Sequence, residues 1–447
     1  MNALSRLRAG ELAGARRLDL SCGLEEFPRE IFDLADSLEV LDLSGNALST
    51  LPDDLHRLHR LRILFCSANR FTVLPEAIGR CPQLDMVAFK ANRIRTVAEA
   101  ALPQRLRWLI LTDNEIESLP AALGRRTRLQ KLMLAGNRLT ALPAELANCR
   151  ALELLRISAN RLEALPDWLH ALPRLSWLAF AGNPFDEAPE AEALSSTALP
   201  AIDWSRLVLK RKLGEGASGV IHEAEWRRDD GETQTVAVKL FKGAVTSDGW
   251  PHSEMTACLA AGAHPNLITV LGTVRGHPER TDGLVLERVD SRFVNLAGPP
   301  SFESCTRDVY AEDARWSART AARLAFGIAS AAAQLHARGI LHGDLYAHNI
   351  LWDRQGAAFL GDFGAASFLP RAAGTQARTL AATEARAFGC LLEELLARID
   401  APARTGLDAC APLSRLMTRC LDEDPAARPA FDEIASILAR TVDTIDD

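Results

Sequence analysis

Apolar residues recur at a fixed interval through the first half of the chain. The segment LEVLDLSGNALSTLP at residues 38–52 returns as LRILFCSANRFTVLP at residues 61–75, and five further copies follow. In each copy, alternating apolar residues lead to an asparagine, and these asparagines lie 23 residues apart with a single interval of 22. They are Asn46, Asn69, Asn92, Asn114, Asn137, Asn160 and Asn183. Such a period predicts a stack of repeating structural units.

Each copy predicts one short strand. Leucines on either side of a strand residue point to the same face, so stacked copies form a parallel sheet over a continuous apolar core. The asparagine side chain can satisfy backbone groups where the chain leaves the strand. An earlier copy at residues 18–28 has Gly23 in the asparagine position, as expected of a terminal cap. These motifs resemble leucine-rich repeats over residues 1–189.

The strand residues that face away from this core predict a concave surface. A solvated strand face would be polar, but this face is largely apolar and aromatic, which indicates a protein-binding surface. Its residues are Val40, Ile63, Phe65, Met86, Trp108, Ile110, Met133, Leu154 and Trp177, with Lys131 among them. The alternative is that this stripe packs against the chain's own second half.

The pattern changes after the last copy. Residues 186–204 are rich in proline, alanine and acidic residues, and after them two strand patterns at residues 207–226 flank a glycine-rich turn. The glycines of this G-x-G-x-x-G turn are Gly214, Gly216 and Gly219. Glycines mark any tight turn, but a strand on both sides favours a flap over phosphates, because a helix follows the turn in dinucleotide-binding folds.

Further motifs follow in order. The strand pattern TVAVKLF contains Lys239, and Glu254 lies 15 residues later in a segment leading to HPNL. The decapeptide LHGDLYAHNI contains Asp344 and Asn349, FLGDFGAAS contains Asp362, and CLDEDPAARPAFDEI ends the series. An aspartate and an asparagine at this spacing are what a phosphoryl-transfer enzyme uses to align a nucleophile and to hold a metal.

Together these motifs resemble the protein kinase superfamily, and the chain as a whole resembles a leucine-rich-repeat protein kinase of the bacterial, cytoplasmic type. The resemblance implies a multidomain fold, α/β plus α+β, in which a repeat solenoid with a parallel sheet precedes a two-lobed kinase domain that binds ATP between its lobes. The expected parts are a repeat domain at 1–189, a linker at 190–204, a kinase domain at 205–440 and a tail at 441–447.

The resemblance also implies a role for each motif residue. Asp344 accepts the proton of the attacking hydroxyl, while Lys239 clamps the ATP phosphates and is itself held by Glu254. Asn349 and Asp362 hold Mg²⁺. The implied ATP-binding residues are Gly214, Gly216, Gly219, Ile221, Ala237, Lys239, Glu287, Val289 and Leu351, with Leu286 as gatekeeper. Fixed cations and metal-binding oxygens suit this chemistry, because positioning and charge neutralisation supply most of the catalysis.

Three features depart from the usual kinase pattern. Gly343 stands where most protein kinases have an arginine that docks an activation-loop phosphate, so we expect no such phosphate control. Only 22 residues separate Asp362 from Glu384, and no A-P-E tripeptide occurs. Arg428 in the last motif therefore lacks its usual glutamate partner. An unpaired buried arginine is costly, so we expect a substitute carboxylate or partial exposure.

The acceptor of the phosphoryl group stays open. Tyr346 stands where serine/threonine kinases usually have a lysine, and His348 where tyrosine kinases often have an arginine. The H-G-D-x-x-x-x-N loop around Asp344 also resembles that of small-molecule kinases such as aminoglycoside and choline phosphotransferases. We expect an ATP-dependent protein kinase, with a serine or threonine acceptor ahead of tyrosine. The alternatives are a small-molecule kinase and a nucleotide-binding scaffold without activity.

The composition limits the expected cellular location and the expected kinds of partner. The net charge of −7 argues against nucleic acid or a membrane surface as a partner. Nine scattered cysteines without a C-x-x-C pair indicate reduced thiols rather than disulfides or zinc. The N-terminus lacks the apolar segment of a signal peptide, and no run of about 18 apolar residues occurs. We therefore expect a cytoplasmic protein whose partner or substrate is another protein.

Overall fold

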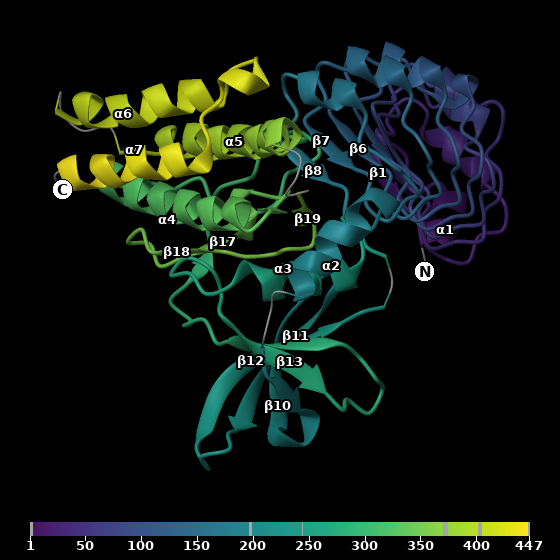
Figure 1. Ribbon diagram of the computed structural model, residues 1–447. Helices are drawn as coiled ribbons and strands as arrows, with labels where there is room; N and C mark the ends of the chain where they lie inside the picture. Colours follow the sequence, from purple (N-terminus) through teal and green to yellow (C-terminus); the bar gives the residue numbers. More distant parts are fainter. Residues whose placement is uncertain (1–2, 196–198, 244, 370–373, 401–404, 446–447) are drawn as a thin grey trace. The chain divides into compact units, whose positions relative to one another are not determined.

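The computed structural model describes residues 3–195, 199–243, 245–369, 374–400 and 405–445 (Figure 1). Contacts within the chain divide it into two compact units, Met1–Leu172 and Pro173–Asp447. The division falls directly before the last copy of the repeat, at residues 175–189, rather than after it. The last repeat therefore belongs with the second half of the chain.

The first unit is a stack of short parallel strands. Its strands pair in register with their neighbours in chain order. They are β1 (Arg17–Asp19), β2 (Val40–Asp42), β3 (Ile63–Phe65), β4 (Met86–Ala88), β5 (Trp108–Ile110), β6 (Lys131–Met133) and β7 (Leu154–Arg156). The helical segments are α1 (Ala3–Arg8), η1 (Arg29–Leu34), η2 (Leu55–Arg57), η3 (Glu76–Arg80), η4 (Glu99–Ala101), η5 (Ala121–Arg125), η6 (Ala144–Asn148) and η7 (Asp167–Ala171). This confirms the predicted solenoid.

The repeat asparagines satisfy the backbone where each strand ends. Asn114 Nδ2 donates to the carbonyls of Phe89 and Leu111 at 2.9 and 3.0 Å, and its Oδ1 accepts from the Ile94 N–H at 2.9 Å. Each such side chain therefore links its own turn to the preceding repeat. Equivalent bonds are made by Asn46, Asn69, Asn92, Asn137 and Asn160.

The predicted concave stripe of the first unit differs in accessibility along its length. The Lys131 ammonium lies over the Trp108 ring, 4.1 Å from the centroid, so a cation–π contact engages part of the stripe. The half-buried positions are Val40, Phe65, Trp108, Ile110 and Met133. The buried ones are Ile63, Met86 and Leu154. Only the first group presents side-chain surface to a partner.

The second unit begins with the last repeat. Five short elements open it: β8 (Trp177–Ala179), η8 (Pro184–Asp186), α2 (Glu187–Ser195), β9 (Ala201–Asp203) and η9 (Trp204–Arg206). The segment expected as a linker, 190–204, thus contains the end of α2 and the whole of β9. The strand β9 is held in place because Ile202 is buried in the core of the neighbouring sheet, where β9 pairs in parallel with β13 (Val270–Arg275).

A mixed sheet forms the small lobe of the second unit, with the strand order β10-β11-β12-β14-β13-β9. The remaining strands are β10 (Leu207–Glu215), β11 (Gly219–Arg227), β12 (Thr233–Phe241) and β14 (Gly283–Glu287), and the lobe's helix is α3 (Pro251–Ala261). Val236, Val238 and Val285 are among its fully buried core residues. Leu284, next to Val285, belongs to a second buried cluster with Phe241 and Leu259, so both faces of β14 are covered.

The large lobe is mainly helical (Figure 1). Its helical elements are α4 (Ala318–Ala337), η10 (Ala347–Asn349), α5 (Gly374–Leu396), α6 (Thr405–Cys420), η11 (Pro425–Ala427) and α7 (Phe431–Thr444). Its strands are β15 (Val294–Asn295), β16 (Ile340–Leu341), β17 (Ile350–Trp352), β18 (Ala358–Leu360) and β19 (Ser367–Phe368). The expected tail at 441–447 begins inside α7, because Thr441 is buried there. The two-lobed fold is confirmed. No helix in the described ranges has the length and apolar character needed to cross a bilayer.

Candidate active site

The glycine-rich turn joins β10 to β11 beside β12. A Cβ atom at Gly219 would lie 2.5 Å from the Leu240 carbonyl oxygen, so any side chain there would collide with the neighbouring strand. At Gly214 and Gly216 a Cβ atom would meet nothing within 4 Å. The glycines thus serve close strand packing at one end of the turn and leave open space along the rest, which suits a loop that approaches phosphates.

Lys239 on β12 and Glu254 on α3 form an ion pair. Burial lowers the pKa of Lys239, but the charge of Glu254 and its hydrogen bond outweigh this effect, and the net shift is upward. The ammonium is therefore protonated at neutral pH and held in one place. A fixed cation in a partly buried position is what clamping of phosphate oxygens requires.

A cavity lies beside this ion pair. Its wall includes Gly216, Gly219, Ile221, Lys239, Glu254, Leu286 and Asp362. Five of the residues expected at the nucleotide lie outside this wall: Gly214, Ala237, Glu287, Val289 and Leu351. Other wall residues were missed by sequence reasoning, among them Val270, Leu284 and Cys258. Leu284 was predictable, because it lies two residues before Leu286 and so shares its face of β14.

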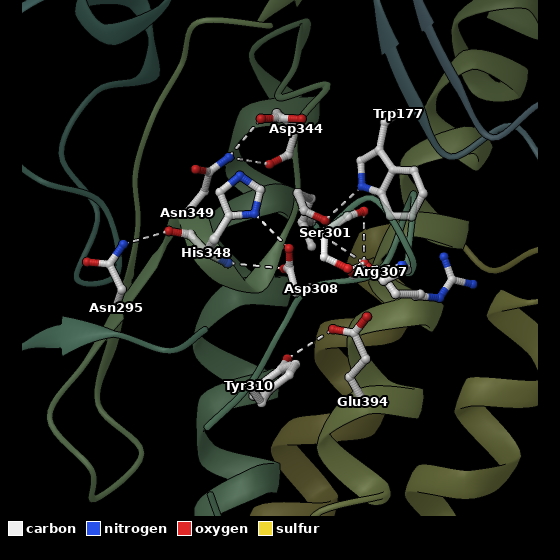
Figure 2. A network of polar contacts seen from close by, with 12 residues as sticks. Trp177, Asn295, Ser301, Arg307, Asp308, Tyr310, Asp344, His348, Asn349 and Glu394 are labelled. Carbon is white, nitrogen blue, oxygen red and sulfur yellow. Dashed lines mark hydrogen bonds and ion pairs between the residues drawn. The ribbon is translucent and has the colours of Figure 1, made fainter. Parts of the chain in front are cut away.

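The loop between β16 and η10 holds Asp344 and Asn349 together. Asn349 Nδ2 donates to Asp344 Oδ2 at 2.8 Å and to the Asp344 carbonyl at 3.0 Å. The amide therefore fixes both the carboxylate and its backbone. Figure 2 shows the pair beside His348.

Asp362 lies at the start of the D-F-G motif, in the cavity wall. Its backbone is left-handed with φ 56°, and its Oδ1 accepts from the Gly364 N–H at 3.1 Å. Within the described ranges, no group of three or more His, Cys, Asp or Glu side chains forms a metal site by itself. Magnesium is usually held by one or two protein oxygens together with substrate phosphates. The oxygen donors of Asn349 and Asp362 fit a metal that binds with a nucleotide.

A buried acid–histidine pair supports the same loop. Asp308 accepts from the His348 N–H at 3.1 Å, and its other oxygen lies 2.7 Å from His348 Nδ1. Burial lowers the pKa of His348, but the hydrogen bond and charge of Asp308 outweigh it and raise the pKa above its ordinary value. Asn295 Nδ2 donates to the His348 carbonyl at 2.8 Å. Figure 2 shows Asp308 and Asn295 on either side of His348. Nothing in the sequence around Asp308 indicated this role.

Family models match both halves of the chain. Residues 207–386 match the model for protein tyrosine and serine/threonine kinases, and residues 127–185 and 37–58 match two leucine-rich-repeat models. The chain combines leucine-rich repeats with a protein kinase domain. The kinase match begins at β10 and ends inside α5.

Several named proteins are similar to the chain. A probable serine/threonine-protein kinase of Dictyostelium discoideum, gdt4, is 26% identical over 55% of this chain and 16% of its own length. A second probable serine/threonine-protein kinase of that organism is 26% identical over 52% of the chain and 16% of its length. The tyrosine-protein kinase receptor TYRO3 of Gallus gallus is 27% identical over 36% of the chain and 19% of its length. The chain thus spans less than a fifth of each relative. All three are eukaryotic, which gives no support to the expected bacterial type.

Trp177 does not lie on an open concave surface, and its prediction as a partner anchor is wrong. Its side chain is 1% exposed, its Nε1 donates to the Leu345 carbonyl at 3.1 Å, and its ring stacks on Tyr346 at 4.1 Å between centroids. All three residues belong to the second unit. For this residue the alternative is correct: it packs against the kinase domain.

Arg428 also differs from expectation, because it is 4% exposed and has no carboxylate within ion-pair distance among the described residues. Its guanidinium donates to three backbone carbonyls, those of Asp422, Ala382 and Pro173, at 2.9, 3.1 and 2.7 Å. Burial lowers the pKa of Arg428 to about 10. Carbonyl dipoles therefore replace the expected glutamate, and one of them comes from Pro173, directly before the last repeat.

Proposed function

We propose that the chain is an ATP-dependent protein kinase that transfers the γ-phosphoryl group to a serine or threonine hydroxyl of a protein. The observation that carries the proposal is the convergence of Lys239, Glu254 and Asp362 on one cavity beside the glycine-rich turn. Separate motifs far apart in sequence supply these residues. Their meeting is what a nucleotide site requires.

Each chain residue has a defined task in this proposal. Asp344 accepts the proton of the attacking hydroxyl, and Asn349 holds its carboxylate in a fixed direction. Lys239 binds phosphate oxygens, and Glu254 restrains Lys239. Magnesium, when bound by Asn349 and Asp362, supplies neutralisation of the charge on the phosphates. A positioned base of this kind contributes about 10²–10⁴-fold to the rate.

The choice of acceptor rests on the relatives and the family model. Two of the three relatives are named serine/threonine-protein kinases and one a tyrosine-protein kinase receptor. The match to the protein kinase model favours a protein acceptor over a small molecule. We therefore place serine and threonine ahead of tyrosine.

We further propose that the repeats of the first unit recruit the protein substrate or a regulator. The positions available for contact are the half-buried ones, with Trp108 and Ile110 among them. A bound partner would be present near the kinase domain at a raised effective concentration. The nine cysteines are free thiols, which suits our proposal of a cytoplasmic location.

Radiolabelled ATP tests the activity directly. Asp344→Asn is expected to lower phosphorylation of itself or of a general protein substrate by about 10²–10⁴-fold. Binding of Mg-ATP, measured by calorimetry, should persist. Asp353→Asn is a matched control, because that carboxylate only accepts from the N–H groups of Gln355 and Ala357 in a turn. Equal activity in wild type and Asp344→Asn would contradict the enzymatic proposal.

A further inference from the structure

The last repeat strand packs on the backbone that follows Asp344. The Trp177 indole N–H donates to the carbonyl of Leu345, the residue directly after Asp344, at 3.1 Å. The indole plane lies within 6° of parallel to the Tyr346 ring. Leu345 and Tyr346 are themselves buried. One side chain of the repeat therefore restrains two consecutive residues of the catalytic loop, residues 342–349.

A second contact joins the two residues directly after this strand to the segment after the D-F-G motif. The backbone N–H groups of Phe180 and Ala181 both donate to Ser367 Oγ, at 2.9 and 3.2 Å. Ser367 lies on β19, which pairs with β16 directly before the catalytic loop through Leu341↔Ser367. The strand is thus connected to both segments that carry the proposed phosphoryl-transfer residues.

A third contact explains the glycine that stands in the usual arginine position. A Cβ atom on Gly343 would lie 2.6 Å from the Leu178 carbonyl oxygen and 2.5 Å from that of Ala365. The repeat strand occupies the space that a side chain at position 343 would need. Close backbone packing therefore replaces a side chain that could respond to phosphate.

We propose that the last repeat strand is a built-in part of the kinase site, and that Trp177 is a positioning residue for Asp344. This inference rests on the proposed kinase function. Trp177 holds the peptide group between Leu345 and Tyr346, one residue beyond Asp344, while Asn349 holds the carboxylate and carbonyl of Asp344 itself. A displacement of about 1 Å at such a site can lower the rate by about 10²-fold.

The position of Trp177 separates its effect from nucleotide binding. The wall of the cavity beside Lys239 does not include Trp177, Leu345 or Tyr346. A change at Trp177 should therefore lower kcat and leave the KM for ATP unchanged. An interaction that acts only on the transition state gives this pattern.

The full-length chain offers a matched control. Trp316 is also buried in the second unit, and its Nε1 donates to the Leu395 carbonyl on α5 at 3.0 Å instead of to a residue of the catalytic loop. Trp177→Phe and Trp316→Phe each remove one indole hydrogen bond and keep an aromatic ring. Losses of thermal stability should be similar, whereas the effects on kcat should differ.

The experiment measures kcat, the KM for ATP and Tm for both phenylalanine variants and for Trp177→Ala, at a temperature well below every Tm. Trp177→Phe should lower kcat roughly three- to tenfold, the range of one hydrogen bond. Trp177→Ala, which also removes the stacking, should approach about 10²-fold. Trp316→Phe should retain the wild-type kcat.

Two outcomes separate the inference from the function on which it rests. If Asp344→Asn lowers activity but Trp177→Phe and Trp316→Phe have equal kcat values, the kinase proposal stands and the positioning role is refuted. If Asp344→Asn has no effect on activity, the kinase proposal itself fails. A Trp177→Phe variant that raises the KM for ATP at constant kcat would also overturn the positioning role.

Discussion

The Glu384 carboxylate accepts a hydrogen bond from the Gly343 backbone N–H at 2.7 Å. Its other oxygen lies 2.6 Å from His336 Nε2 and also accepts from the His342 N–H at 3.3 Å. Burial raises the pKa of Glu384, but the hydrogen bond and charge of His336 outweigh it and the net shift is downward. A buried carboxylate on α5 thus holds the loop that leads to Asp344.

Glu384→Ala should leave two backbone N–H groups and the half-buried His336 ring without this acceptor. Removing one partner of a buried pair costs about 3–5 kcal/mol, so we expect a loss of this size in the free energy of unfolding, measured with urea. Glu393→Gln is the control on the same helix, because its contact with Arg307 is exposed and long, at 3.8 Å. It should cost at most about 1 kcal/mol. Equal losses in the two variants would contradict this role of Glu384.

Restoring a side chain at position 343 should not restore phosphate control. Gly343 has φ 74°, and a Cβ atom there meets two carbonyl oxygens. Gly343→Arg should therefore destabilise the kinase domain and lower kcat. Gly276→Ala is the control, since Gly276 has φ 76° but open space around it, and its strain alone costs about 1–2 kcal/mol. The collision predicts a larger drop in Tm for Gly343→Ala than for Gly276→Ala, and the reverse order would refute it.

Much of the fold was predictable, because its signals are local or periodic. The repeat interval predicts the strands and their register, and the asparagines take the places expected of them. The structure also places Lys239 beside Glu254, as expected from the kinase motifs that contain them. These residues are recognisable because their side-chain chemistry leaves few substitutes.

The parts that could not be predicted depend on backbone atoms or on distant contacts. Arg428 pairs with carbonyl groups, and every residue has a carbonyl, so no sequence pattern marks its partners. Trp177 meets Leu345 across 168 residues of chain. The apolar side chain of Trp177 predicted that another surface would cover it, but it did not identify that surface. The linker was misjudged because one buried residue, Ile202, is enough to anchor a short strand.

The repeat asparagines should stabilise the first unit, and the more buried asparagines should contribute more. Asn114→Ala would leave the N–H of Ile94 without its acceptor in a buried site, whereas the carbonyl of Leu111 would keep Asn137 as a donor. Each unsatisfied group costs about 1–3 kcal/mol. Asn92→Ala removes equivalent bonds at a half-buried position. Water can reach that site, so urea unfolding should show a smaller loss. A larger loss at Asn92 would contradict this argument.

Glu394 should make the stability of the second unit depend on pH. Burial, followed by the nearby charge of Asp308, raises the pKa of Glu394 to about 7 from an ordinary value of 4.5, although the Tyr310 hydroxyl donates to it at 3.0 Å. Between about pH 4.5 and 7 the unfolded chain loses this proton while the folded chain keeps it. Stability should therefore fall as pH rises through this window, by at most about 1.4 kcal/mol per pH unit.

Glu394→Gln removes the titration and keeps an oxygen that accepts from Tyr310. The free energy of unfolding of this variant should not fall over this range. The difference between the variant and wild type should therefore increase from about pH 4.5 to pH 7. Tyr310→Phe is the companion variant, because it removes a hydrogen bond that lowers the pKa of Glu394. It should extend the fall to higher pH. Urea unfolding across this range measures both effects. If the unfolding free energies of wild type and Glu394→Gln run parallel with pH, the raised pKa of Glu394 is refuted.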